Sequence, residues 1–308
     1  MARTVKAFAP ASYSNLSVGY DILGLALSSI GDVVELEERP DKRIEIIDIQ
    51  GAEGLSMDKN KNVCGVVIQA MQTNVDGPGV NITIKKGFQP GSGLGSSSAS
   101  SVAAAVAYNA LLNQPFNQVD LLDFALEGEY VACGARHADN VAPCLFGGLT
   151  MVKSYDPLDI LQLPIPKGLF MATVFPNVEV KTADSRSKVP KAVSTSLLTQ
   201  QVSSMAAFIK ALYEEDISLM AQSMVDYVAE PGRKDLIPHF DDMKSKALAL
   251  GALNFGISGS GPTVYALTNN EGVALEIIKE LDALLIQHGI ENFSFVEPLE
   301  PDTGAYII

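Results

Sequence analysis

The chain reads Pro90-Gly91-Ser92-Gly93-Leu94-Gly95-Ser96-Ser97-Ser98-Ala99-Ser100 at the junction that decides its fold. Three glycines alternate with small residues and lead directly into an alanine-rich run over 101–107. Glycine reaches backbone angles that are closed to residues with a Cβ, whereas alanine is the strongest helix former. A strand-like alternation over 80–85 precedes the glycines, so the predicted order is strand, glycine loop and helix.

A glycine loop that opens a helix is a typical site for an anion. The first amides of a helix have no partner within it, and the helix dipole adds about half a positive charge there. Phosphate groups bind at such helix ends. Two common signatures are missing, because no lysine follows the glycines as in a Walker loop and their spacing differs from a dinucleotide fingerprint. The loop predicts a phosphate site, and a flexible loop capping a buried helix is the alternative.

The composition narrows the class of protein. Of 308 residues, 22 are Lys or Arg and 36 are Asp or Glu, which gives a formal net charge of −14. This charge argues against nucleic acid or an acidic membrane surface as a partner. Three widely spaced cysteines fit a reducing compartment and form no disulfide or zinc pattern. Because the sequence contains neither an apolar signal segment nor a run of about 18 apolar residues, we expect a cytoplasmic protein.

The next predicted helix carries a carboxylate that faces inward. The helix begins after Asn117, a predicted N-cap, and ends at Gly134. Its apolar stripe has one gap, and Glu129 fills that gap, whereas Glu127 falls on the polar side. A buried carboxylate needs a cation beside it. Opposite a phosphate loop we predict Mg²⁺ at Glu129, and an internal ion pair is the alternative.

Further polar side chains stand in predicted loops or at a helix start. In chain order they are Asn15, Asp21, His137, Asp139, Asn140, Arg186 and Arg233. The first two lie in a polar loop over 9–21, where turn and cap roles are the alternative. The next three are expected to face a cleft. The two arginines belong to a chain with few cations, and a solvated surface position is the alternative for each.

Helix and strand patterns mix in both halves of the chain, which favours an α+β fold with two domains. A proline-rich segment over 156–168 marks the boundary, and the expected domains are residues 1–160 and 161–308. In the second half, helices are predicted over 194–214, 216–229, 238–250 and 271–288, and strands over 169–175, 264–268 and 293–296.

Three motifs stand apart in the chain. They read Pro10-Ala11-Ser12-x-x-Asn15-Leu16-x-x-Gly19-Tyr20-Asp21, Pro90-x-x-x-Gly-Leu-Gly-Ser-Ser-x-Ala and Gly256-x-x-Gly-Ser-Gly-Pro-Thr263. Together and in this order they resemble the GHMP kinase superfamily of galacto-, homoserine, mevalonate and phosphomevalonate kinases. The resemblance implies an N-terminal ATP-binding domain with a left-handed β-α-β unit, a ferredoxin-like C-terminal domain, and an active site between the two.

Within the superfamily the chain is similar to the homoserine kinases. The segments that carry this similarity are His137-x-Asp139-Asn140-Val141-Ala142-Pro143-Cys144, Thr182-x-x-x-Arg186, Glu230-Pro-x-Arg233 and Asp302-Thr303-x-Ala305. Ser17 and Tyr20 stand where the family often has glycine and phenylalanine. The resemblance implies transfer of the γ-phosphoryl group of ATP to the side-chain hydroxyl of L-homoserine, by a homodimer as in many relatives. A mevalonate-type kinase and a catalytically silent nucleotide-binding relative are the alternatives.

The resemblance also implies roles in binding ATP. Residues 90–100 hold the phosphates, Asn62 lies near the adenine, and Ser97 and Glu129 bind Mg²⁺. Charge neutralisation and positioning are what phosphoryl transfer requires.

The acceptor site follows from the same resemblance. Arg186 and Arg233, with Thr182, hold the carboxylate of the amino acid, since a guanidinium fork matches a carboxylate. Asp21, helped by Asn15, binds the ammonium group. The hydroxyl of the acceptor lies against His137, Asp139 and Asn140. The expected catalytic residues are Asn140 and His137 beside this hydroxyl, and Glu129 at the Mg²⁺. No general base is assigned: the γ-phosphate itself can take the proton, and His137 and Asp139 compete for that role.

Overall fold

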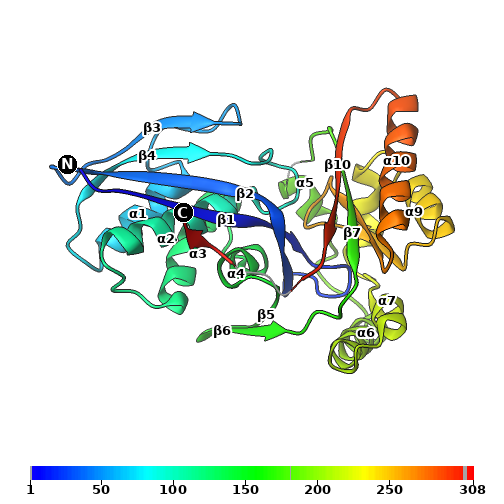
Figure 1. Cartoon of the computed structure of the whole chain (residues 1–308). Helices are drawn as coiled ribbons and strands as arrows, with labels where there is room; N and C mark the ends of the chain where they lie inside the picture. Colours follow the sequence, from blue (N-terminus) through cyan, green and yellow to red (C-terminus); the bar gives the residue numbers. More distant parts are fainter. Residues whose placement is uncertain (1, 181, 301–303) are drawn as a thin grey trace.

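The computed structural model describes residues 2–180, 182–300 and 304–308, without the side chains of residues 182 and 183. Two lobes lie side by side (Figure 1). The first is built on a seven-stranded sheet and the second on a four-stranded sheet, each with helices packed on it. The predicted α+β architecture is confirmed.

The first sheet holds the N-terminal half of the chain. Its strands are β1 (Thr4–Ser14), β2 (Leu23–Arg39), β3 (Ile44–Gln50), β4 (Gly79–Lys85), β5 (Leu149–Tyr155), β6 (Leu158–Leu163) and β11 (Tyr306–Ile307). Their order is β11-β1-β2-β4-β3, and β5 pairs with β2 and β6. Val80, Ile82 and Ile84 alternate inward along β4, as a strand with one buried face requires. β3 and β4 run parallel and are joined through α1 (Val63–Gln72), which makes them the β-α-β unit.

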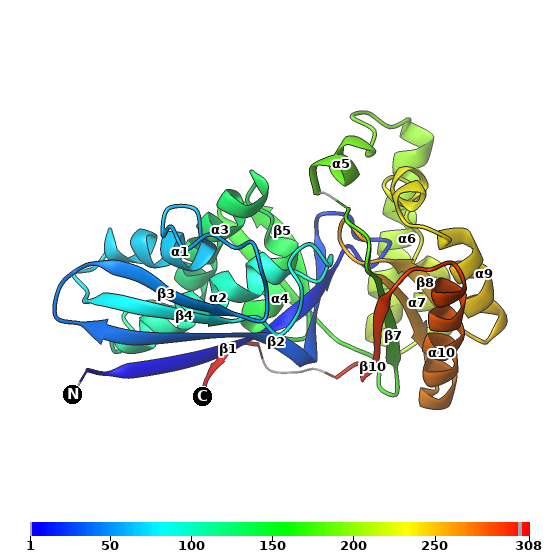
Figure 2. The same cartoon turned by 90° about the horizontal axis from the view of Figure 1, so that it is seen from above.

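Helices α1, α2 (Ser96–Leu111) and α4 (Ala138–Phe146) pack on this sheet, and α3 (Gln118–Cys133) packs on these three helices (Figure 2). All alanines of α2 except the partly buried Ala110 are fully buried, because their small side chains let the helix pack closely. α3 has the predicted ends: the Asn117 side chain accepts hydrogen bonds from the amides of Val119 and Asp120, and Gly134 has a φ of 78°. The boundaries that position Glu129 are confirmed.

The second sheet comprises β7 (Phe170–Pro176), β8 (Asn254–Ile257), β9 (Val264–Thr268) and β10 (Asn292–Pro298). Their order is β10-β7-β9-β8, and these neighbouring strands pair antiparallel. Numbered along the chain this is 4-1-3-2, the ferredoxin-like order, so that prediction is confirmed. The remaining elements are α5 (Thr182–Ser187), α6 (Thr195–Glu214), α7 (Ile217–Ser223), α8 (Glu230–Arg233), a 3₁₀ turn (Lys234–Leu236), α9 (Phe240–Ala249) and α10 (Glu271–Gln287).

Two local predictions were wrong. The helix expected over 216–229 ends at Ser223, because the Asp226 carboxylate accepts the amides of Val228, Ala229 and Glu230 and so starts α8 instead. The polar loop expected from residue 9 begins only after Ser14, where consecutive residues adopt left-handed backbone angles and end β1.

The chain end returns to the first lobe, where β11 pairs with β1. The domain boundary near residue 160 stays a prediction, and residues 302 and 303 lie outside the described part of the chain. Within that part, no helix combines the length and apolarity needed to cross a membrane.

Candidate active site

A cleft of about 370 Å³ lies between the lobes and is lined by both. It brings together most of the predicted site residues: Asn15, Asp21, Asn62, Pro90, Gly91, Gly93, Gly95, Ser96, Ser97, Ser100, Glu129, His137, Asp139, Asn140, Arg186 and Arg233. Four members of the glycine stretch, Ser92, Leu94, Ser98 and Ala99, are buried outside its lining. Thr182 begins α5, and its side chain lies outside the described part.

The glycine loop has a conformation that only glycine accommodates. Gly91, Gly93 and Gly95 have φ values of 77°, 84° and 68°. A Cβ on Gly95 would lie 2.4 Å from the hydroxyl of Ser12. Gly95 is the N-cap of α2, so the helix begins at Ser96. The first amides of α2 therefore stand at the cleft wall formed by Gly95, Ser96 and Ser97.

A buried ion pair that the sequence did not reveal contacts the end of the glycine stretch. The Lys86 ammonium contacts the Asp32 carboxylate and donates to the Ser96 carbonyl (2.8 Å) and the Ser100 hydroxyl (2.9 Å). Ser100 in turn donates to Asp32 at 2.6 Å. Burial raises the pKa of Asp32, and the Lys86 charge opposes that shift. No local pattern marks the two residues: Lys86 directly follows β4 and Asp32 lies within β2, and each has the local sequence of an ordinary charged residue until the tertiary fold joins them.

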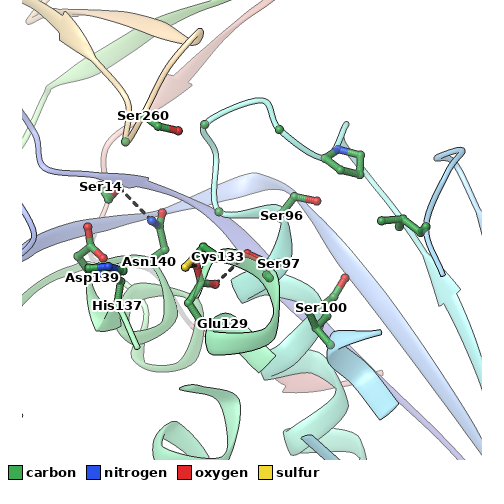
Figure 3. Close-up of a pocket in the computed structure, with 18 of the residues that line it drawn as sticks. Ser14, Ser96, Ser97, Ser100, Glu129, Cys133, His137, Asp139, Asn140 and Ser260 are labelled. Atoms are coloured by element: carbon green, nitrogen blue, oxygen red, sulfur yellow. Dashed lines mark hydrogen bonds between the residues drawn. The ribbon is translucent and has the colours of Figure 1, made fainter. Parts of the chain in front are cut away.

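Glu129 faces inward as predicted. It is 7% exposed, whereas the Glu127 side chain is 42% exposed and pairs with Arg136 at 3.3 Å. The Glu129 carboxylate accepts hydrogen bonds from Ser97 (2.8 Å), Ser98 (2.9 Å) and the Cys133 thiol (3.2 Å). Figure 3 shows Glu129 and Ser97 facing each other. The hydrogen-bond partners of this carboxylate among the described residues are all neutral, so its charge is uncompensated by an ion pair.

Asn140 is held by two serines at the end of β1. Its side-chain oxygen accepts from the Ser12 hydroxyl at 2.9 Å. Its amide nitrogen donates to the Ser14 hydroxyl at 3.0 Å (Figure 3). The Asn140 side chain is therefore fixed in orientation. Ser14 was missed by the sequence argument, because its role depends on a partner 126 residues away.

Two titratable groups beside Asn140 have polar atoms without partners in the described part of the chain. They are Oδ1 of Asp139 and Nε2 of His137, and both atoms are buried. Burial, and then the carboxylates of Asp21 and Glu129, raise the pKa of Asp139 to about 7. Burial lowers the pKa of His137, although Asp21, 3.8 Å from its Nδ1, opposes the shift. Unsatisfied polar atoms in a cleft point to a ligand that satisfies them.

Asn15 fixes the backbone at Asp21. This is the turn role that the sequence offered as the alternative to a functional one. The Asn15 side chain accepts the amide of Asp21 at 2.9 Å and donates to the carbonyl of Gly259 at 3.0 Å. Both ends of the Asn15 amide are therefore engaged within the protein. The Asp21 carboxylate, by contrast, is partly exposed at the cleft beside His137.

The two predicted arginines line the opposite side of the cleft. Arg233 is 5% exposed and donates from Nη1 to the Gly259 carbonyl at 2.8 Å. Its guanidinium lies 5.0 Å from the centre of the Tyr20 ring, and its buried Nε has no partner in the described part of the structure. Arg186 is half-buried in α5. A solvated surface position is therefore wrong for Arg233.

Comparisons with known proteins agree with this architecture. The family model of the GHMP kinases N terminal domain matches residues 61–148, and that of the GHMP kinases C terminal matches residues 208–287. A homoserine kinase of Chlorobaculum tepidum is 40% identical, with 99% of this chain and 98% of that protein covered. The crystal structure of homoserine kinase from Cytophaga hutchinsonii has a TM-score of 0.95 at 40% identity and covers 99% of this chain and 97% of its own. The L. major mevalonate kinase structure (TM-score 0.75, 16% identity, 98% of each chain) shares the fold.

Proposed function

This chain belongs to the GHMP kinase family, and from that membership we propose that it transfers the γ-phosphoryl group of ATP to the side-chain hydroxyl of L-homoserine. ATP-dependent phosphorylation of a small molecule follows from the family. The observation that carries the choice of acceptor is the placement of Arg233 and Asp21 in one cleft with the glycine loop. An amino acid presents a carboxylate and an ammonium group, and these two side chains are complementary to them.

The glycine loop and the start of α2 are our proposed site for the phosphates of ATP, through backbone amides and the helix dipole. Ser97 and Glu129 are the proposed ligands of Mg²⁺, since hard oxygens suit that ion and the Glu129 charge has only neutral partners among the described residues. No group of three or more His, Cys, Asp or Glu side chains that could hold a metal occurs in the part of the chain that the structure describes, so phosphate oxygens and water would have to complete this site. Mg²⁺, when bound, neutralises charge on the transferring group. Ser98 and Cys133 hold the Glu129 carboxylate.

Asn62 is proposed to shape the adenine end of the cleft. Its side chain accepts the Cys64 amide at 3.0 Å as the N-cap of α1 and donates to the Ser56 carbonyl at 2.9 Å. Both polar ends of the side chain are thus engaged, so Asn62 acts by fixing the wall formed by Ser56 and the start of α1.

Arg186 and Arg233 are proposed to bind the homoserine carboxylate, because the free Nε of Arg233 gives that guanidinium an unused donor. Asp21, positioned by Asn15, binds the ammonium group. Thr182 is included among the proposed carboxylate-binding residues only because it belongs to the Thr182-x-x-x-Arg186 motif. A mevalonate-type acceptor has a carboxylate but no ammonium group, so it leaves Asp21 without a role.

The hydroxyl end of the acceptor is assigned to His137, Asp139 and Asn140. Asn140 is oriented by Ser12 and Ser14 and donates to the reacting oxygens. A carboxyl with a pKa of about 7 is suited to accept a proton at neutral pH, which makes Asp139 the better candidate base. Transfer of the proton to the γ-phosphate is the competing route.

The pH dependence separates these two routes. If ionised Asp139 accepts the hydrogen bond of the hydroxyl, kcat/KM for homoserine rises about tenfold between pH 6 and pH 8, following the ionised fraction of a group with pKa about 7. Asp139→Asn should lower kcat/KM and flatten this acidic limb in a steady-state pH profile. An unchanged limb in Asp139→Asn would assign the proton to the phosphate.

Stability provides an independent check on Asp139. Its pKa is higher in the folded protein than the value of about 3.9 for an unfolded chain, so the folded state binds the proton more tightly. Stability must then fall as pH rises from about 4 to 7. We expect the Tm of the ligand-free protein to fall more between pH 5 and pH 8 than that of Asp139→Asn. Identical pH dependences would contradict the raised pKa.

The direct test is release of ADP in the presence of ATP and Mg²⁺ with L-homoserine, mevalonate, galactose or no acceptor. We expect turnover only with homoserine. Turnover only with mevalonate would overturn the role of Asp21, turnover only with galactose would also overturn the roles of the two arginines, and no turnover with any acceptor would favour a catalytically silent relative. We also propose a cytoplasmic homodimer, for which light scattering after size exclusion should give twice the mass of one chain.

A further inference from the structure

The turn between β8 and β9 contains the third motif of the sequence, which has no role so far. It contributes Gly259 and Ser260 to the cleft wall, opposite the glycine loop (Figure 3). Two of its hydroxyl groups are fully buried and point to that loop. Thr263 donates to the Ser92 carbonyl at 2.6 Å, and Ser258 donates to the Gly93 carbonyl at 2.7 Å. The start of the phosphate loop is therefore attached to the opposite lobe.

The contact between the turn and the loop leaves no room for a side chain. A Cβ on Gly93 would lie 2.8 Å from the carbonyl oxygens of both Gly261 and Ser258. The backbone amide of Thr263 also approaches the Ser92 carbonyl, at 3.3 Å. Since Ser92 is itself buried, its carbonyl depends on these donors rather than on water.

The other side of the same turn holds the acceptor site. The Gly259 carbonyl accepts hydrogen bonds from Asn15 at 3.0 Å and from Arg233 at 2.8 Å. The Gly259 amide donates to the Ser14 carbonyl at 3.2 Å. One turn thus contacts the phosphate loop, the strand end that orients Asn140, and the arginine proposed for the substrate carboxylate.

We propose that Ser258 and Thr263 are positioning residues that fix the phosphate loop to the turn that holds Arg233, so that nucleotide and acceptor are presented at a set separation. This inference deepens the proposed function and rests on it. Neither residue lines the cleft. Each acts by satisfying a loop carbonyl, and without it the loop amides around Gly93 lose their fixed direction toward the phosphates.

Thr263→Val is the decisive variant, because it keeps the shape of the side chain and removes the hydroxyl. Loss of one buried hydrogen bond is expected to weaken ADP binding about tenfold, measured by calorimetry with Mg²⁺ and no acceptor. Thr263→Ser keeps the hydroxyl and should restore the affinity. In steady state Thr263→Val should raise the KM for ATP and lower kcat, with the KM for homoserine within about twofold of wild type.

The matched control is Thr268→Val, at the far end of β9, the strand that begins directly after Thr263. Thr268 is also buried, and its hydroxyl accepts the amide of Asn270 at 3.2 Å, away from the loop. It should lower Tm while leaving ADP affinity unchanged. If Thr263→Val binds ADP as Thr268→Val does, the hydroxyl is merely structural and the proposal is wrong. Should Thr263→Val fail to fold, Ser258→Ala provides the same comparison at the second contact.

The outcomes distinguish this inference from the choice of acceptor. ADP affinity is measured without any acceptor, so it does not depend on homoserine. A wild-type protein inactive on homoserine, together with weaker ADP binding in Thr263→Val, would overturn the acceptor and keep the positioning role. A wild-type protein active on homoserine, together with equal ADP affinities in all variants, would keep the acceptor and overturn the positioning role.

Discussion

Glu129→Gln is expected to lower kcat by about 10²–10³-fold while the protein stays folded. The amide keeps an oxygen that accepts from Ser97 and Ser98, so the packing of α3 against α2 is retained. What disappears is the negative charge that we assign to Mg²⁺. Weaker binding of the ion should make the remaining activity depend on Mg²⁺ over a higher concentration range, and excess Mg²⁺ should partly restore it.

Glu127→Gln is the control for this prediction, since Glu127 lies two residues away on the exposed face of the same helix. It should have wild-type kcat and Mg²⁺ dependence. A readout independent of turnover is the thiol of Cys133, whose pKa is raised to about 12 by burial and then by the Glu129 charge. Glu129→Gln should therefore increase its rate of alkylation at pH 8. Wild-type kinetics in Glu129→Gln would remove Glu129 from the metal site.

Arg233→Leu is expected to raise the KM for homoserine by about 30-fold or more, because loss of one partner from a buried charged contact costs about 2–5 kcal/mol. The guanidinium is buried against Tyr20, so water cannot replace it on the substrate carboxylate. ADP affinity should change little, since the Gly259 carbonyl keeps its bond from Asn15. The measurement is steady-state kinetics with each substrate varied in turn, alongside calorimetry with ADP.

Two further arginine variants sharpen this test. Arg233→Lys keeps a charge but loses the planar fork, and should have an intermediate KM for homoserine. Arg136→Leu removes a partly exposed arginine that pairs with Asp123 and Glu127 outside the cleft, and should have a wild-type KM. An unchanged KM for homoserine in Arg233→Leu would exclude Arg233 from the acceptor site, and a parallel loss of ADP affinity would indicate collapse of the Gly259 turn.

Helix α3 shows what local sequence patterns can predict. Its N-cap, its glycine stop and the inward position of Glu129 were all predicted, because capping and helical periodicity depend on residues within a few turns of one another. The glycine loop was predicted for the same reason, as positive φ values are a property of the residues themselves. The three motifs added the family, and with it the ferredoxin-like order of the second sheet.

The partners of these residues were decided by the tertiary structure. Lys86 meets Asp32, Thr263 meets Ser92 and Asn140 meets Ser14 across separations of 54, 171 and 126 residues. No periodicity extends that far, and a hydroxyl or a strand-end charge has the same local appearance whether it is solvated or buried. Sequence by itself therefore determined which residue types form the loop, the inward carboxylate and the arginines. Only the tertiary structure decided which atoms hold them, within the first lobe for Lys86 and Asn140 and between the two lobes for Thr263, because a hydrogen bond over such a separation exists only after the distant segments have been brought together.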